Sequence, residues 1–179
     1  MIYLVRHGEP ESGWGDAPDP GLSGPGKAQA EAVAQMLAEA GARTAVTSPL
    51  ARCRQTAAPF ERLLETHARL EPSVGEVRTP AGLTDRPAWL RDVMAGSWAE
   101  AGEALEGWRR RVLAAVEAVP GDTAVFTHFV AINAVVSLLT GDERVLVFRP
   151  GHCSVTRLER SGGRLHVAEL GAEAATKVT

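Results

Sequence analysis

An apolar run at the N-terminus ends abruptly at Arg6-His7-Gly8, and this junction predicts the fold class. The run, residues 2–5, is too short for a helix and rich in strand-forming residues, so it predicts a strand buried on both faces. Such strands form parallel sheets, which bind ligands beyond the carboxyl ends of their strands. We therefore expect an α/β fold in which Arg6 and His7 reach a ligand, with Gly8 allowing the backbone to turn sharply and approach it.

The 179 residues fit a single domain, residues 1–179. The formal net charge of −3 argues against nucleic acid as a partner, so an anion site requires a local group of arginines. Cys53 and Cys153 have no metal-ligand spacing, so we expect free thiols in a reducing compartment. The sequence has neither the features of a signal peptide nor the roughly 20 apolar residues that span a bilayer. We expect a soluble cytoplasmic protein, and the sequence leaves its oligomeric state open.

Glycine, proline and apolar spacing predict alternating strands and helices along the rest of the chain. Residues 9–21 form a surface loop, in which Trp14 either anchors the loop or faces a substrate. Strands are expected at 43–47 and 123–127, a hairpin at 154–169, helices at 24–40, 49–64, 87–94, 97–119 and 130–139, and an irregular segment at 67–77.

The start of the second predicted helix suits anion binding. Ser48 is expected to cap this helix, with Pro49 at its first position. Arg52 then lies in the first turn, where free N–H groups and the helix dipole already favour anions. The run Arg109-Arg110-Arg111, by contrast, is interpreted as the solvated face of a later helix.

Two predicted strands end in histidine, at His7 and His128, and Arg6 and Arg52 can gather at the same edge of the sheet. This set is suited to phosphoryl transfer without a metal ion, because guanidinium groups bind phosphate oxygens and neutralise the transition state. One neutral imidazole would attack phosphorus, and the second, as a cation, would donate to the phosphoryl oxygens. A carboxylic acid must protonate the leaving alkoxide.

Ordered motifs along the chain resemble the histidine phosphatase superfamily of phosphoglycerate-mutase-like proteins. The motifs are Arg6-His7-Gly8-Glu9, Leu22-Ser23 with Gly26 and Gln29-Ala30, Ser48-Pro49-Leu50-Ala51-Arg52 with Thr56-Ala57, Thr127-His128 and Ser154-Val155-Thr156. The resemblance implies a three-layer α/β/α sandwich with a mostly parallel central sheet. It also implies a phosphohistidine intermediate and no cofactor.

Carried over by position, the resemblance makes His7 the nucleophile, His128 the second pocket histidine, and Arg6 and Arg52 the phosphate ligands. Val74-Gly75-Glu76 best matches the segment that holds the family's acid. Glu76 is therefore the predicted acid, with Asp85 in reserve and a solvated loop carboxylate as the alternative interpretation of Glu76.

Several positions depart from the family pattern. Phe129 replaces a usual glycine after the second histidine; its backbone N–H can still contact an anion, but its ring needs room. Asn133 stands where an arginine is common, and the first loop offers Ser12 and Trp14 in place of an asparagine. His152, before the late strand, is a weaker candidate for the pocket.

We expect a phosphatase of phosphomonoesters and not a mutase, because little sequence between Thr56 and His128 is left to enclose the site from water. The expected partner is a small phosphorylated metabolite or phosphate, but the sequence does not decide between a small-metabolite phosphatase and a phosphohistidine protein phosphatase. The alternatives are a phosphohistidine protein phosphatase, a phosphoglycerate mutase, or a binding module with this fold and little turnover. Phe129 is the main support for the binding module.

Overall fold

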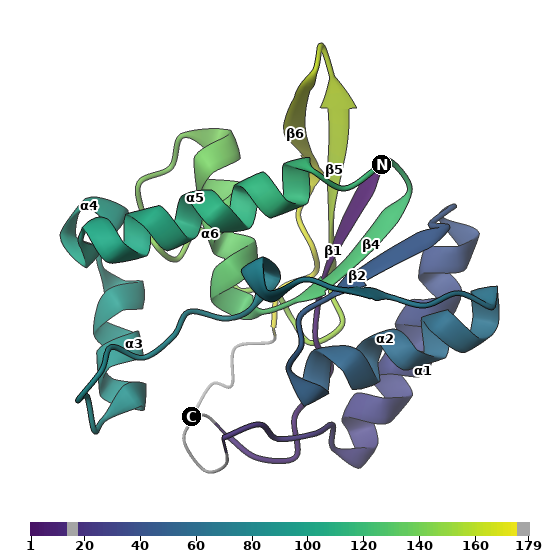
Figure 1. Cartoon of the computed structure of the whole chain (residues 1–179), viewed down its shortest axis with the longest axis horizontal. Coiled ribbons are helices and arrows are strands. Elements are labelled where there is room, and N and C mark those ends of the chain that lie inside the picture. Colours follow the sequence, from purple (N-terminus) through teal and green to yellow (C-terminus); the bar gives the residue numbers. More distant parts are fainter. Residues whose placement is uncertain (14–17, 175–179) are drawn as a thin grey trace.

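A six-stranded sheet with the order β3-β2-β4-β1-β5-β6 crosses the middle of the molecule (Figure 1). The computed structural model describes residues 1–13 and 18–174. Strands β1 to β4 are parallel to one another, whereas β5 and β6 are antiparallel additions at one edge. The strands are β1 (Ile2–Arg6), β2 (Thr44–Thr47), β3 (Arg69–Leu70), β4 (Thr123–Thr127), β5 (Val155–Ser161) and β6 (Arg164–Glu169).

Helices cover both faces of this sheet, as Figure 1 shows. One face packs on α1 and α2, and the other on α5 and α6. The helices are α1 (Gly24–Glu39), α2 (Ala51–Leu64), α3 (Arg86–Ala95), α4 (Trp98–Ala101), α5 (Glu103–Glu117) and α6 (Phe129–Thr140), with a 3-10 turn, η1, at Pro72–Val74. The α/β class with a mostly parallel sheet, predicted from the first strand, is confirmed.

Side chains that alternate between the two faces of β1 contribute to two apolar cores, one on each face of the sheet. Tyr3 and Val5 face α1 and α2, whereas Ile2 and Leu4 face α5 and α6, because successive residues of a strand point to opposite faces. The neighbouring β4 divides in the same way, so residues 2–6 and 123–127 bury both sides, as the unbroken apolar run predicted.

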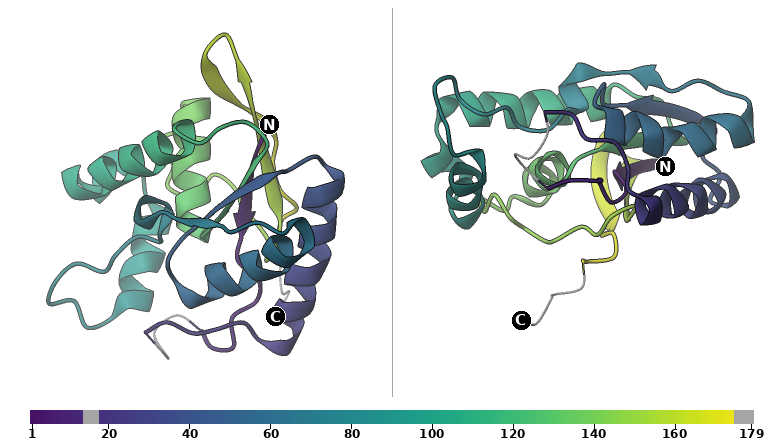
Figure 2. Two further views of the ribbon diagram at one scale, coloured as in Figure 1. Left: turned by 45° about the vertical axis from the view of Figure 1, so that its right-hand side comes forward. Right: turned by 90° about the horizontal axis from the view of Figure 1, so that it is seen from below.

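The β5–β6 hairpin projects beyond the rest of the molecule (Figure 1; Figure 2, left). Gly162 and Gly163, both with positive φ, form the predicted turn. Helix α3 and the loop before it lie on the side of the molecule away from α1 (Figure 2, left). In the described part of the chain, no helix is long and apolar enough to cross a membrane.

The predicted helix over 97–119 is interrupted. Gly102 has φ of +89°, which ends α4 and begins α5. Ser97 and Glu100 form a reciprocal capping box on α4, so the first few residues make a separate short helix. The long helical prediction was wrong at this one glycine, whose backbone conformation L-residues rarely adopt.

Arg109 is buried, which contradicts the prediction of a solvated basic run. Only 3% of the residue is exposed. Its guanidinium lies 4.9 Å from the Trp98 ring and donates hydrogen bonds to the Ser137 hydroxyl and the Asp142 carbonyl. Arg110 does follow the prediction and pairs with Glu106 at the surface. The three arginines thus point in different directions and do different things.

Gly8 is needed for packing, because a Cβ there would lie 2.7 Å from the Gly26 carbonyl oxygen. A Cβ on Gly26 would in turn lie 2.1 Å from the Glu9 carbonyl oxygen. The two glycines let the segment after β1 cross the first turn of α1. The close backbone approach expected toward a ligand is therefore an approach to a helix.

Candidate active site

Neighbouring parallel strands bring the two predicted histidines together. Arg6 on β1 lies opposite Thr127 on β4, and the His7 N–H donates to the Thr127 carbonyl at 3.0 Å. The next residues, His7 and His128, therefore leave the sheet side by side. Their ring centroids are 5.3 Å apart and the rings meet edge to face. Both side chains are buried.

A backbone hydrogen bond fixes the tautomer of His7. Nδ1 lies 2.8 Å from the Gly8 carbonyl oxygen, and because a carbonyl only accepts, Nδ1 carries the proton and Nε2 keeps its lone pair. Burial lowers the pKa of His7 well below its usual value, and the charges of Arg6 and Arg52 lower the pKa further. The ring is neutral at neutral pH, with one nitrogen available as a nucleophile.

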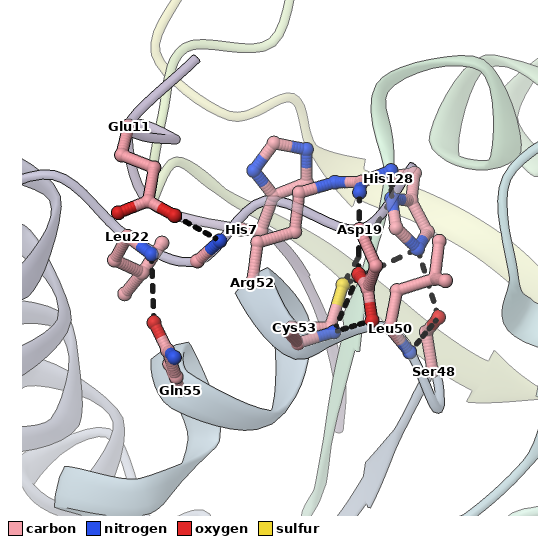
Figure 3. A network of polar contacts seen from close by, with 12 residues as sticks. His7, Glu11, Asp19, Leu22, Ser48, Leu50, Arg52, Cys53, Gln55 and His128 are labelled. Carbon is pink, nitrogen blue, oxygen red and sulfur yellow. Dashed lines mark hydrogen bonds and ion pairs between the residues drawn. The ribbon is translucent and has the colours of Figure 1, made fainter. Parts of the chain in front are cut away.

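Arg52 and Arg6 approach this pair from different elements. Arg52, in the first turn of α2 as predicted, extends toward His128, and its Nη2 is 3.3 Å from the His128 Nδ1 (Figure 3). Arg6 donates to the Pro150 carbonyl at 2.8 Å. The buried Nε of Arg6 has no hydrogen-bond partner in the described part of the chain. Burial lowers the pKa of Arg6 to about 10, so its charge persists at neutral pH.

The contacts of His128 favour a neutral ring in the absence of a phosphoryl group, so the predicted cation donating to phosphoryl oxygens stays a prediction. A guanidinium only donates, so the His128 Nδ1 accepts from Arg52 and the proton lies on Nε2. Nε2 is 2.8 Å from the Ser48 hydroxyl oxygen. Burial lowers the pKa of His128 well below its usual value, and His7 and Arg52 add to this effect. A dianionic phosphoryl group would oppose that shift.

Ser48 has a different role from the one predicted. It does not cap α2, whose N-cap is Leu50 with no side-chain hydrogen bond. The Ser48 backbone N–H extends the β2–β4 pairing by donating to the Phe126 carbonyl, which places its hydroxyl beside His128. Sequence inspection missed this contact because a serine before Pro49 reads locally as a cap.

Asp19 from the first loop caps α2 instead. Its carboxylate accepts from the Ala51 N–H at 2.9 and 3.1 Å and lies 3.9 Å from Arg52 (Figure 3). No sequence signal pointed to Asp19, because the contact joins residues 32 positions apart. The Asp19 carboxylate therefore accepts a hydrogen bond from the N-terminus of α2 and also lies near Arg52, which is predicted to bind phosphate.

Glu76 lies on the wall of the candidate site, at the start of α6. Its carboxylate accepts from the Val130 and Val77 N–H groups, each at 3.1 Å. Burial nevertheless raises the pKa of Glu76 above its usual value. A solvated loop carboxylate does not describe this group. Asp85, the reserve acid, is an exposed N-cap that accepts from the Ala88 N–H on α3.

Phe129 finds room by packing under Arg6. Its ring is 7% exposed, joins an apolar cluster with Leu90 and Trp98, and lies 5.0 Å from the Arg6 guanidinium carbon. The predicted anion contact of Phe129 through its backbone stays a prediction. Asn133 holds structure: it donates to the Phe129 carbonyl and accepts from two backbone N–H groups, those of Val147 and Phe148.

A cavity of about 1130 Å³ opens beside these groups. His7, Ser48, Arg52 and Glu76 line it, together with Ser12. Arg6, His128 and Phe129 are not among the lining residues, and His128 is fully buried. The Ser12 hydroxyl is buried without a hydrogen-bond partner among the described residues. Trp14 lies outside the residues that the structure describes.

His152 does approach the pocket, since its ring centroid is 6.0 Å from that of His7. Burial lowers the pKa of His152 to about 4. The thiols of Cys53 and Cys153 are free. Within residues 1–13 and 18–174, no group of three or more His, Cys, Asp or Glu side chains is placed to hold a metal ion.

Residues 2–173 match the histidine phosphatase superfamily (branch 1), and the chain belongs to this family. A probable phosphoglycerate mutase, GpmB, of Photorhabdus laumondii is 29% identical, over 89% of this chain and 84% of the relative. The structure also resembles a phosphoserine phosphatase from Entamoeba histolytica in complex with 3-phosphoglyceric acid, with a TM-score of 0.77, 18% identity and 96% of each chain covered.

A mycobacterial glucosyl-3-phosphoglycerate phosphatase in complex with VO3 is similar as well. Its TM-score is 0.75 at 23% identity, covering 96% of this chain and 98% of that one. These likenesses establish the phosphoglycerate-mutase-like fold that the motifs implied.

Proposed function

We propose that this chain is a metal-independent phosphatase that hydrolyses phosphomonoesters through a phosphohistidine on His7. The observation that carries the proposal is the His7 ring, with its proton held on Nδ1 and Nε2 free, beside the guanidinium groups of Arg6 and Arg52. A neutral imidazole next to two fixed cations is suited to attack an anionic phosphoryl group.

In the first step, the His7 Nε2 lone pair forms a bond to phosphorus as the bond from phosphorus to the ester oxygen breaks. Arg6 and Arg52 neutralise the phosphoryl oxygens, and the buried unpaired Nε of Arg6 is a donor available for this purpose. Protonated Glu76 gives its proton to the departing alkoxide. The raised pKa of Glu76 favours the protonated form that this step requires.

In the second step, water attacks the phosphohistidine. The Glu76 carboxylate takes a proton from this water, inorganic phosphate leaves, and Nε2 recovers its lone pair. His128, held by Ser48 and Arg52, lies against His7 throughout and is placed to gain a proton when the phosphoryl charge arrives.

A second candidate is a phosphoglycerate mutase, favoured by the 29% identical relative of that name. A mutase must keep its phosphohistidine from water while the intermediate reorients. The similar proteins include both phosphatases and a probable mutase, so the choice is between hydrolysis of the phosphomonoester and its isomerisation.

The test is to follow inorganic phosphate and isomerisation in one assay with 3-phosphoglycerate and a panel of phosphomonoesters. We expect steady phosphate release that is lost in His7→Ala and retained in His67→Ala, an exposed histidine. Interconversion of phosphoglycerates with little phosphate release would overturn the proposal in favour of the mutase.

A further inference from the structure

The cavity is much larger than a phosphoryl group needs. At about 1130 Å³ it exceeds the usual upper range of about 1,000 Å³ for sites that hold drug-sized ligands. It extends from His7 and Arg52 to helices α3 and α5 on the far wall. The site therefore has room for a large leaving group, and the lining of the far wall should indicate its chemistry.

Each of the two far-wall helices presents a tryptophan and an arginine to the cavity. The residues are Arg86 and Trp89 on α3 and Trp108 and Arg111 on α5. In both helices the two side chains are three positions apart and so share a face. Both indoles are partly exposed. Two helices that are distant in sequence thus carry the same pairing toward one space.

The cavity lining also carries positive charge that is unpaired among the described residues. Arg111 on α5 and Arg78, in the loop that follows Glu76, are exposed and form no ion pair with any residue that the structure describes. Arg86 is already engaged with Thr79 and the Val77 carbonyl. Among the described residues that line the cavity, Glu76 is the one carboxylate, and its raised pKa reduces its negative charge.

The two arginines that precede Arg111 do not contribute charge to the cavity. Arg109 is buried against Trp98, and Arg110 pairs with Glu106 outside the cavity. Only Arg111 of the three lines the cavity. Arg111 thus adds a positive charge to the cavity in a chain whose formal net charge is −3.

We propose that the substrate is a nucleotide-sized phosphomonoester whose leaving group carries a flat ring and a second anionic group. The ring would lie against Trp89 or Trp108, and the second anion would pair with Arg111 or Arg78. This inference rests on the proposed phosphatase function and adds the substrate class. Stacking on an indole and a charge-assisted hydrogen bond to arginine each supply about tenfold in kcat/KM.

A matched series of substrates separates the two features. Ribose 5-phosphate has neither feature, adenosine 5′-monophosphate adds the ring, and adenosine 3′,5′-bisphosphate adds the second anion. We expect kcat/KM for phosphate release to rise about tenfold at each addition. p-Nitrophenyl phosphate serves as the general phosphatase substrate.

Two variants assign the effects to the far wall. Arg111→Gln should reduce the preference for the bisphosphate over the monophosphate about tenfold, and Trp108→Leu should reduce the preference for the monophosphate over ribose 5-phosphate. Arg110→Gln, one residue away on the outside of α5, is the matched control and should leave both ratios unchanged. Circular dichroism would confirm that each variant is folded.

Calorimetric binding of the same three compounds to His7→Ala separates this inference from the proposed function. Absence of turnover in the wild-type protein, with the expected order of binding intact in His7→Ala, would overturn the phosphatase proposal but support the recognition. Two results would overturn the recognition while p-nitrophenyl phosphate is still hydrolysed. One is an equal kcat/KM for the three compounds of the series, and the other is a change in their ratios that is as large in Arg110→Gln as in Arg111→Gln.

Discussion

The proposed mechanism requires the Glu76 carboxyl group first to donate a proton and then to accept one. This group accepts from two backbone N–H groups, which favours the charged form, whereas burial favours the neutral form and prevails. This balance suits a group that alternately donates and accepts a proton. The balance also makes the proposed role testable through the leaving group and the pH.

Glu76→Gln should lower kcat/KM for an alkyl phosphate by about 10²- to 10⁴-fold. The same change should lower kcat/KM much less for p-nitrophenyl phosphate, because p-nitrophenolate leaves without a proton. Comparing kcat/KM for the two substrates isolates the transfer to His7 from the later attack of water, in which Glu76 acts with either substrate. Asp85→Asn, which keeps a cap on α3, is the control, and equal losses of kcat/KM on both substrates would contradict the role of Glu76 as the acid.

The pH profile should carry the same signature. In the proposed first step the acid form of Glu76 is the active one, so kcat/KM for an alkyl phosphate should fall as the pH rises through the raised pKa of this group. In Glu76→Gln this alkaline limb should disappear. A wild-type limb that persists in Glu76→Gln would show that another group is the acid.

At the scale of elements, two glycines fix how β1 leads into α1. A Cβ on Gly8 would collide with the Gly26 carbonyl oxygen, which belongs to the helix backbone and cannot move aside easily. We expect Gly8→Ala to lower the free energy of unfolding by about 1–3 kcal/mol. Urea denaturation would measure the loss.

Gly24→Ala is the matched control, since a Cβ at that position of α1 meets nothing within 4 Å. It should cost much less than Gly8→Ala, because the added Cβ meets only the adjacent Pro25 and no backbone of another segment. Equal destabilisation by both variants would show that the crossing at Gly8 does not limit stability.

Asp19 connects the first loop to the start of α2. Asp19→Ala should lower the free energy of unfolding by about 1 kcal/mol, because the Ala51 N–H loses its acceptor. Asp19→Asn keeps an acceptor and should recover most of that loss. If thermal or urea unfolding shows no difference between the two variants, Asp19 is not an effective cap.

The strands and several residues of the candidate site could be predicted from local sequence patterns. The apolar runs at 2–5 and 123–127 were long enough to predict buried strands, and a parallel pair in register then had to place His7 beside His128. The location of Arg52 at the site was predicted from its position in the first turn of the helix that follows the second strand. These predictions depended on local pattern and on the general geometry of parallel sheets.

The remaining features depend on contacts that no local pattern contains. Ser48 reads as a helix cap, but pairing with β4 turns its hydroxyl toward His128, and Asp19 caps from a distant loop. Arg109 reads as solvated, yet Trp98 and Ser137 bury it. In each case tertiary packing decides between two roles that the residue type allows equally.

At the scale of the whole molecule, three histidines link stability to pH, the buried His7 and His128 and the half-buried His152, whose pKa is lowered to about 4. The pKa values of His7 and His128 are lowered in the folded state, so below about pH 6.5 the unfolded chain binds protons that the folded chain does not. The contribution of these histidines to the free energy of unfolding is fully present above that pH. It falls as the pH decreases, by about 1.4 kcal/mol per pH unit for each histidine. The raised pKa of Glu76 acts with the opposite sign.

Urea denaturation at pH 7.5 and 5.5 would measure this slope. His128→Gln should flatten it, because one of the three histidines with a lowered pKa is removed, whereas His67→Gln, at an exposed position, should not change it. The same slope in wild type and His128→Gln would show that His128 is protonated in the folded protein.

The most direct measurement for the account as a whole is the chemical trapping of the intermediate. Wild-type protein would be mixed with a phosphomonoester at neutral pH, quenched in alkali after a fraction of one turnover, and mapped by peptide mass spectrometry. Alkali is used because a phosphoryl group on an imidazole nitrogen survives it. The account predicts one phosphoryl group on His7, absent in His7→Ala. Phosphate release with His7 unmodified at every time point, or turnover that persists in His7→Ala, would contradict it.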